Sequence, residues 1–204
     1  MARTGRATIA LWNSYDPKAF REAHRRILAR AGPLALAFDF NLATFGFPFP
    51  QELTTPQEIA DWVATTTSIG EDGSYLKEIT AKGRFSTFPY MKKGLPPQLG
   101  RFVLTTCNVD EKKRLGVEEA SSLLVNGQGL VFVFGTGPKG VPRELSEVAE
   151  RHLDITFGGY SLETCTALGA VVAVIAHAMR RGAPIGIGEY GAKSQASRRT
   201  YEPK

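Results

Sequence analysis

Short apolar segments alternate along this chain with segments of helical periodicity, and this alternation restricts the fold more than any other feature. Residues 34–48 ("LALAFDFNLATFGFP") and 129–135 ("GLVFVFG") are almost continuously apolar, as strands buried on both faces of a parallel sheet are. Helical periodicity follows or precedes such segments, for example within 117–126. The order predicts an α/β fold, a mainly parallel sheet with helices on both faces. Ligands of such sheets bind beyond the carboxyl ends of the strands.

Length and charge limit the class of protein. The 204 residues are 43% hydrophobic and 22% charged, which fits one domain with a sizeable core. We expect that domain to cover 1–188 and residues 189–204 to be a flexible basic tail. The net charge of +5 suits a polyanionic partner. Without a membrane-spanning run, a signal-peptide core or cysteines at metal-ligand spacing, the sequence predicts a cytoplasmic protein with no metal.

The first helix carries both a core face and a basic face. We expect Asp16 to cap it, Pro17 to occupy its first position and Gly32 to end it. The basic positions, which do not share the apolar spacing, are Arg21, Arg25, Arg26 and Arg30. Such a face contacts RNA phosphates or is an ordinary solvated surface, and the sequence leaves both interpretations open.

The middle of the chain is predicted to be an inserted helical and lid segment at about 50–100. Helices are expected from Pro56 and over 74–83, and residues 83–100 are expected to form a loop or lid because they lack a clear period. The side chains that could stack on or neutralise an unpaired nucleotide there are Phe88, Tyr90, Lys92 and Lys93. A lid packed on the core would show the same composition. Strands at 101–108 and 153–157 and helices at 142–152 and 161–181 complete the prediction.

A glycine-rich loop interrupts the apolar run "FVFGTGPKGVP" at 132–142. Gly135, Gly137 and Gly140 have the spacing of a dinucleotide fingerprint, and Asp154 lies about where an acidic ribose ligand is wanted. Only one short strand follows, however, and Asp154 begins that strand instead of ending it. An NAD-binding oxidoreductase is therefore the lesser alternative. A P-loop is excluded because Val and Pro follow Gly140 in place of Lys and Ser or Thr.

Taken together, residues 131–181 resemble the C-terminal half of the SPOUT RNA methyltransferases. In that family a buried strand ends in a Gly-rich loop, a helix and a short strand follow, and a Ser-Leu-rich segment opens the last apolar helix. Gly135 to Gly140 match the first motif, and Ser161, Leu162 and Ala167 match the second. Residues 7–48 and 101–130 are compatible with the same family, whereas the middle segment is unmatched.

This resemblance implies a trefoil-knotted domain, a homodimer and S-adenosylmethionine held largely by backbone groups. It also implies the site. The implied cofactor-binding residues are Gly135, Thr136, Gly137, Pro138 and Gly140 in the first loop, Ile155, Thr156 and Gly159 in the second, and Ser161, Leu162 and Thr166 at the last helix. The alternative is that the glycines only form tight turns.

The chain departs from the family pattern at positions that matter for catalysis. Gly137 stands where ribose-methylating members have Glu, Glu163 where they have Asn, and Phe20 where an Asn precedes the motif-one Arg, to which Arg26 or its neighbour Arg25 corresponds. Glu163 and Asp39 are the candidate bases. Glu163 could equally be an electrostatic partner of the cofactor, and Asp39 could bond only to the backbone.

Two functions follow from these residues. The first is an S-adenosylmethionine-dependent methyltransferase acting on tRNA or rRNA, at a base nitrogen or a ribose 2′-hydroxyl. The second is a SPOUT-like RNA-binding protein that has lost catalysis, for which the altered motif positions are the evidence.

Overall fold

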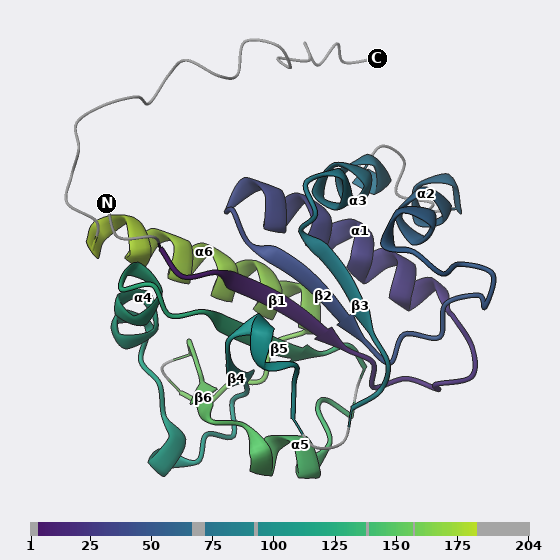
Figure 1. The fold of residues 1–204 in the computed structure, drawn as a ribbon. Coiled ribbons are helices and arrows are strands. Elements are labelled where there is room, and N and C mark those ends of the chain that lie inside the picture. The colour runs from purple at the N-terminus through teal and green to yellow at the C-terminus, as the bar shows by residue number, and fades with distance from the viewer. Residues whose placement is uncertain (1–3, 67–71, 92–93, 138, 157, 183–204) are drawn as a thin grey trace, which may run out of the picture.

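The computed structural model describes residues 4–66, 72–91, 94–137, 139–156 and 158–182. Six strands form one sheet in the order β3-β2-β1-β5-β4-β6, and every pairing is parallel (Figure 1). The strands are β1 (Ala7–Trp12), β2 (Asn41–Phe45), β3 (Phe85–Phe88), β4 (Arg101–Thr105), β5 (Leu130–Gly135) and β6 (Arg151–Leu153). The predicted α/β fold with a mainly parallel sheet is thus confirmed.

Helices cover the two faces of the sheet unequally (Figure 1). One face packs against α1 (Glu22–Ala37), α4 (Val117–Val125) and α6 (Thr164–Gly182), with α2 (Pro56–Thr66) and α3 (Asp72–Ala81) packed on α1. The other face is covered by the short α5 (Arg143–Val148) and by the segment that follows β3. That segment includes the 3-10 turn Pro97–Leu99, and a second turn, Glu111–Lys113, precedes α4.

Alternation along the central strands divides their side chains between two cores. Ile9 and Leu11 of β1 point into the core beneath α1 and α6, whereas Ala10 and Trp12 point into the core beneath α5. All four are fully buried. Burial on both faces explains why these strands are continuously apolar in sequence instead of alternating with polar residues.

The first helix differs from the prediction at both ends. It begins at Glu22 with Arg21 as its N-cap, and the Asp16 carboxylate instead accepts a hydrogen bond from the backbone N–H of Lys18. It also continues through Gly32 and Pro33 to Ala37. A Cβ at position 32 would lie 3.2 Å from a backbone nitrogen of α3, so the glycine admits the neighbouring helix and does not end its own. The strand predicted over 34–48 is correspondingly only β2.

The segment 83–100 is not simply a loop. Its first part is β3, which forms the edge of the sheet beside β2, and Met91, Leu95 and Leu99 pack against the core beneath α5. The helices predicted from Pro56 and over 74–83 are confirmed. The helix predicted over 142–152 ends at Val148, and β6 shares only Leu153 with the strand predicted over 153–157. The predicted tail at 189–204 lies outside the described residues. Within the described part of the chain, no helix is long and apolar enough to cross a membrane.

Candidate ligand-binding site

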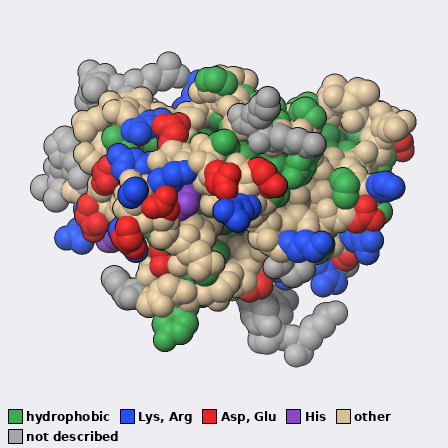
Figure 2. Space-filling model, turned by 90° about the horizontal axis from the view of Figure 1, so that it is seen from below, with side chains coloured by type: hydrophobic (Ala, Val, Ile, Leu, Met, Phe, Trp, Pro, Cys, Tyr) green, Lys and Arg blue, Asp and Glu red, His purple; other side chains and the backbone are tan. Residues whose placement is uncertain are grey.

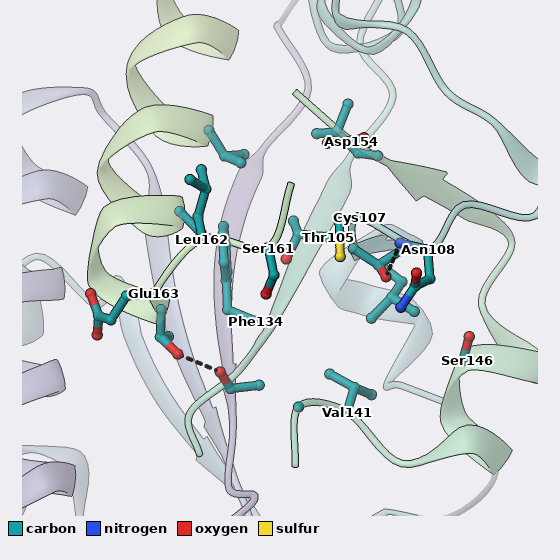
Figure 3. A pocket seen from close by; sticks show the side chains of 18 of the residues that line it. Thr105, Cys107, Asn108, Phe134, Val141, Ser146, Asp154, Ser161, Leu162 and Glu163 are labelled. Atoms are coloured by element: carbon teal, nitrogen blue, oxygen red, sulfur yellow. Dashed lines mark hydrogen bonds between the residues drawn. The ribbon is translucent and has the colours of Figure 1, made fainter. Parts of the chain in front are cut away.

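A cavity of about 1030 Å³ opens at the carboxyl ends of β4, β5 and β6, beside the start of α6. We call it the large cavity. Its walls come from the loops at 105–108, 135–143 and 154–156, from the segment 160–164 and from Ser146 of α5 (Figure 3). This is the edge at which a parallel sheet binds ligands, because loops from several strands converge there.

The glycines of the 135–140 loop fit closely against other parts of the chain. A Cβ at Gly135 would lie 2.5 Å from the carbonyl carbon of Gly140, and one at Gly137 would lie 3.2 Å from the backbone of Ser14. Gly140 has open space around it but a φ of +61°, which favours glycine. The glycines therefore let the loop close on itself and on the turn after β1. The sequence had instead predicted that they let the backbone approach the cofactor.

Hydrogen bonds hold the second loop and tie the start of α6 to the end of β5. The Asp154 carboxylate accepts from the backbone N–H and the hydroxyl of Thr156, at 2.8 and 2.7 Å. The hydroxyl oxygen of Thr156 in turn accepts from the backbone N–H of Tyr160 at 3.0 Å. The Thr164 hydroxyl donates to the Gly135 carbonyl at 3.0 Å, which fixes the first residue of α6 to the end of β5.

Glu163 caps the first turn of α6. Its Oε2 accepts from the backbone N–H groups of Cys165 and Thr166, at 2.9 and 3.1 Å. Partial burial acts to raise the pKa of Glu163, but these bonds outweigh it and the net pKa lies below its usual value. Figure 3 shows Glu163 on the far side of the α6 start from Thr105, Cys107 and Asn108. Its carboxylate is thus ionised and already used by the helix.

The interior of the large cavity is partly apolar and partly polar. The apolar side chains include Leu104, Phe134, Leu153 and Ile155. Ser161 is directed inward, and Cys107 and Asn108 face it across the opening (Figure 3). A ligand that combines a flat ring with hydroxyl or amide groups matches such a lining.

Most of the implied cofactor residues meet in this cavity. Those that line it are Gly135, Gly137, Gly140, Ile155, Thr156, Ser161 and Leu162. Thr136 is buried instead, with its hydroxyl donating to the Trp12 carbonyl at 3.0 Å. Gly159 and Thr166 lie outside the lining, and Pro138 lies outside the described residues.

Sequence reasoning missed two parts of the lining, namely Tyr15 after β1 and the residues that follow β4. The latter are Thr106, Cys107 and Asn108, which line the cavity together with Thr105, the last residue of β4. The rule that ligands bind at strand ends could have found them, because 101–108 was correctly predicted to contain a strand.

Asp39, a candidate base, lies at the amino end of β2, whereas the large cavity lies at the carboxyl ends of the strands. It precedes β2 in a left-handed turn with φ +62°, and its exposed carboxylate pairs with the Arg84 guanidinium at 2.8 Å. The large cavity is at the carboxyl ends of the strands, so Asp39 cannot reach a ligand there. Its assignment as a catalytic residue is corrected accordingly.

A second, smaller cavity of about 420 Å³ adjoins the first between α1 and the start of α6. We call it the small cavity. Arg26 and Arg30 line it from α1, and Cys165 lines it from α6. Tyr15 and Glu163 line both cavities and therefore stand between them.

The arginines of α1 have different surroundings. Arg21 pairs with Asp16 at 3.5 Å and Arg26 with Glu22 at 3.3 Å, and both are exposed. Arg25 is half-buried, with its guanidinium 4.9 Å from the ring centre of Trp62, and is thus mainly a packing residue. Arg30 donates to the Cys165 sulfur at 3.3 Å. The predicted basic face is therefore reduced to Arg21, Arg26 and Arg30.

The aromatic residues proposed to stack on RNA also differ in their surroundings and exposure. Phe88 lies in β3, where its ring stacks on Phe45 with centres 5.0 Å apart, so it belongs to the core beneath α5. Tyr90 is exposed and lies 5.0 Å from the buried Trp12 ring. Lys92 and Lys93 lie outside the described residues. On the face that carries α5, basic and acidic side chains are interspersed (Figure 2).

Solved structures with a similar fold include methyltransferases. A probable methyltransferase from Bordetella pertussis Tohama I has a TM-score of 0.53 at 16% identity, over 86% of this chain and 96% of that one. The TrmH/SpoU tRNA modifying enzyme of A. aeolicus has a TM-score of 0.50 at 14% identity, over 88% and 77%. An rRNA methyltransferase from Sinorhizobium meliloti has a TM-score of 0.51 at 14% identity, over 90% and 59%. At these identities the likeness concerns the fold.

Sequence similarity is higher to an archaeal protein. The uncharacterized protein MJ0224 of Methanocaldococcus jannaschii is 38% identical over 175 residues, which are 86% of this chain and 96% of that protein. A family model, "Protein of unknown function (DUF531)", matches residues 7–176, a range that includes the whole sheet and every described residue that lines the large cavity. The chain therefore belongs to the DUF531 family, and its α/β fold is similar to that of the solved SpoU-type structures.

Proposed function

We propose that this protein is an S-adenosylmethionine-dependent methyltransferase that acts on tRNA or rRNA. The observation that carries the proposal is the large cavity, because it is enclosed by the strand-end loops and helix start at which the SPOUT resemblance locates the cofactor. The fold likeness to tRNA- and rRNA-modifying enzymes supports the same reaction class. We propose the trefoil knot and the homodimer on the same resemblance.

The lining of the large cavity fits S-adenosylmethionine. Leu104, Phe134 and Ile155 offer apolar surface to an adenine ring, and the backbone of the 135–140 loop offers polar groups to its edge. Thr105, Asn108 and Ser161 can bond to ribose or amino-acid groups. Bound there, the cofactor would supply a methyl group activated by a positively charged sulfur.

The carboxylates of the site indicate which acceptor is favoured. Among the described lining residues the carboxylates are Asp154 and Glu163, and each accepts hydrogen bonds from its own loop or helix. A ribose hydroxyl needs a base to take its proton, whereas a ring nitrogen with a free lone pair does not. We therefore favour a base nitrogen as the acceptor, with the protein supplying alignment.

RNA would approach over the small cavity. Arg26 and Arg30 line it, Arg21 is exposed on the same helix, and the small cavity adjoins the large one at Tyr15 and Glu163, which line both. Exposed arginines neutralise phosphates and release counterions, in keeping with the net charge of +5. Tyr90 remains a candidate for stacking on a base.

Because Asp154 and Glu163 already accept hydrogen bonds from their own loop and helix, the second candidate function also stays open. That function is an RNA-binding protein without catalysis. Cofactor binding and turnover separate the two functions. An inactive relative of the family has no need to retain affinity for the methyl donor.

Titration calorimetry with S-adenosylmethionine and S-adenosylhomocysteine tests the proposal. We expect both to bind to the wild-type protein, and Leu162→Trp, which adds bulk to the wall of the large cavity, to weaken binding strongly. Val148→Trp is the matched control, because Val148 is 46% exposed, Leu162 is 38% exposed, and only Leu162 lines the cavity. Absence of heat with either ligand at millimolar concentration would overturn the proposal. Binding without transfer of a labelled methyl group to total tRNA or rRNA would favour the inactive alternative.

A further inference from the structure

Tyr15 separates the two cavities. It lies in the turn after β1 and lines both the large and the small cavity. Its ring carbon Cδ1 lies 3.3 Å from where a Cβ at position 137 would be, so the ring packs directly on the glycine loop. The next residue back, Ser14, donates its backbone N–H to the Thr136 hydroxyl at 3.3 Å. The position of this turn therefore determines the shape of one wall of the site.

Asn13 holds the turn in place with its whole amide group. The buried Oδ1 accepts from the backbone N–H of Tyr15 at 3.0 Å and lies 2.9 Å from Nε2 of His24. The Nδ2 group donates to the Gly46 carbonyl at 2.8 Å, beyond the end of β2. Asn13 thus joins the ends of two strands to α1.

His24 completes this arrangement from α1. Its Nδ1 accepts from the backbone N–H of Arg21 at 3.0 Å, so the ring proton lies on Nε2 and is donated to Asn13. The ring is fully buried between Phe20, Phe47 and Tyr15, with ring centres 5.1 to 5.3 Å apart. Burial lowers the pKa of His24, which keeps the ring neutral as these two bonds require.

We propose that Tyr15 is a ligand-contacting residue of the large cavity, and that His24 and Asn13 are positioning residues that fix its ring between the two cavities. The ligand, an adenosyl compound, rests on the proposed function. The positioning itself rests only on the contacts described. A ring at this place lies between a methyl donor in the large cavity and an RNA acceptor in the small cavity. The two would come into contact only where the cavities meet.

The competing explanation is that His24 only caps α1. Its two nitrogens serve the two roles separately, because Nδ1 accepts from Arg21 and Nε2 donates to Asn13. His24→Asn retains an acceptor near Nδ1 and loses the bond to Asn13. His24→Gln retains an N–H donor near Nε2 and loses the capping bond. The two substitutions therefore give opposite results under the two explanations.

Hydrogen exchange of the ligand-free protein is the first arm of the test. In His24→Asn we expect peptides covering 13–16 and 135–141 to exchange about tenfold faster, as after loss of one buried hydrogen bond. His24→Gln should exchange at nearly the wild-type rate in both. Leu28→Ala removes a buried side chain from the same helix and controls for general destabilisation. It should not produce a selective increase of exchange in these two peptides. The reverse order of the two His24 variants would overturn the positioning role.

Affinity for S-adenosylhomocysteine is the second arm. We expect Tyr15→Ala and His24→Asn to bind about tenfold more weakly, and Tyr15→Phe and His24→Gln to bind like the wild type. Unchanged affinity in Tyr15→Ala would overturn the contact. If the wild type binds no such ligand, the proposed function fails, while the exchange arm still decides the positioning. Should a His24 variant not fold, Asn13→Ala takes its place, with the result expected for His24→Asn.

Discussion

Glu163 occupies the junction of the two cavities, but its carboxylate bonds to the first turn of α6. An amide oxygen can accept the same two hydrogen bonds, so we expect Glu163→Gln to transfer methyl groups at close to the wild-type rate. A catalytic base replaced in this way would lose about a hundredfold or more. Glu163→Ala removes the cap and should lower the free energy of unfolding by about 1 kcal/mol. Single-turnover methyl transfer and urea denaturation measure the two effects.

The pH dependence of stability gives an independent check of the same cap. Burial opposes the ionised form of Glu163, but the backbone bonds prevail and the folded-state pKa lies below the usual value. The stabilisation is therefore present above the unfolded-state pKa and is lost as the pH falls through the folded-state pKa. Glu163→Gln cannot titrate, so its unfolding free energy should decline less than that of the wild type between about pH 6 and pH 3. Parallel declines would contradict the cap.

Among the elements, the glycine loop after β5 makes the sharpest prediction. A Cβ at Gly135 meets the backbone of Gly140 at 2.5 Å, so Gly135→Ala must shift the loop and should weaken S-adenosylhomocysteine binding about tenfold or more. Gly83→Asn is the control, because Gly83 has open space around it and a φ of +65° that Asn tolerates, and it lies outside the lining of the large cavity. Calorimetry should find wild-type affinity in this control. Equal affinities in both variants would mean that the loop does not shape the cavity.

The sequence predicted the elements whose signals are local and missed those that depend on packing. β4, β5 and α6 were found because a doubly buried strand and a long apolar helix are distinctive. The start of α1 was missed because its cap relies on His24, whose position depends on the buried Asn13. Its end was missed because Gly32 and Pro33 resemble a stop, and the close packing of α3 cannot be read from the sequence.

The same distinction applies to the candidate site. The loops at 135–140, 155–156 and 161–163 were predicted because they contain the glycines and the Ser-Leu segment of the resemblance. Tyr15 and the residues after β4 were missed because only the strand order β1-β5-β4-β6 brings them beside those loops. Asp39 was misassigned because a long apolar run does not indicate where the helix ends and the strand starts.

For the molecule as a whole, α6 determines the expected assembly. Leu168, Val171 and Ile175 face the core, yet a second side carries Ala170, Ala173 and Val174 between the exposed Thr166 and His177, and Val174 is itself 39% exposed. A surface helix needs only one apolar side, so the second side indicates burial against another copy of the chain. We expect light scattering at micromolar concentration to give twice the chain mass of 22.2 kDa.

Charge introduced on that side of α6 should dissociate the dimer. Val174→Asp would bury an unpaired carboxylate at the interface, and we expect dimer affinity to fall by about a hundredfold or more. Val148→Asp is the matched control, because Val148 of α5 is similarly exposed, at 46%, but belongs to the opposite face of the sheet. The control should stay dimeric. A wild type with the mass of one chain would contradict the dimer, and a dimeric Val174→Asp would mean that the subunits meet elsewhere, because an unpaired buried charge is too costly for an interface centred on α6 to retain.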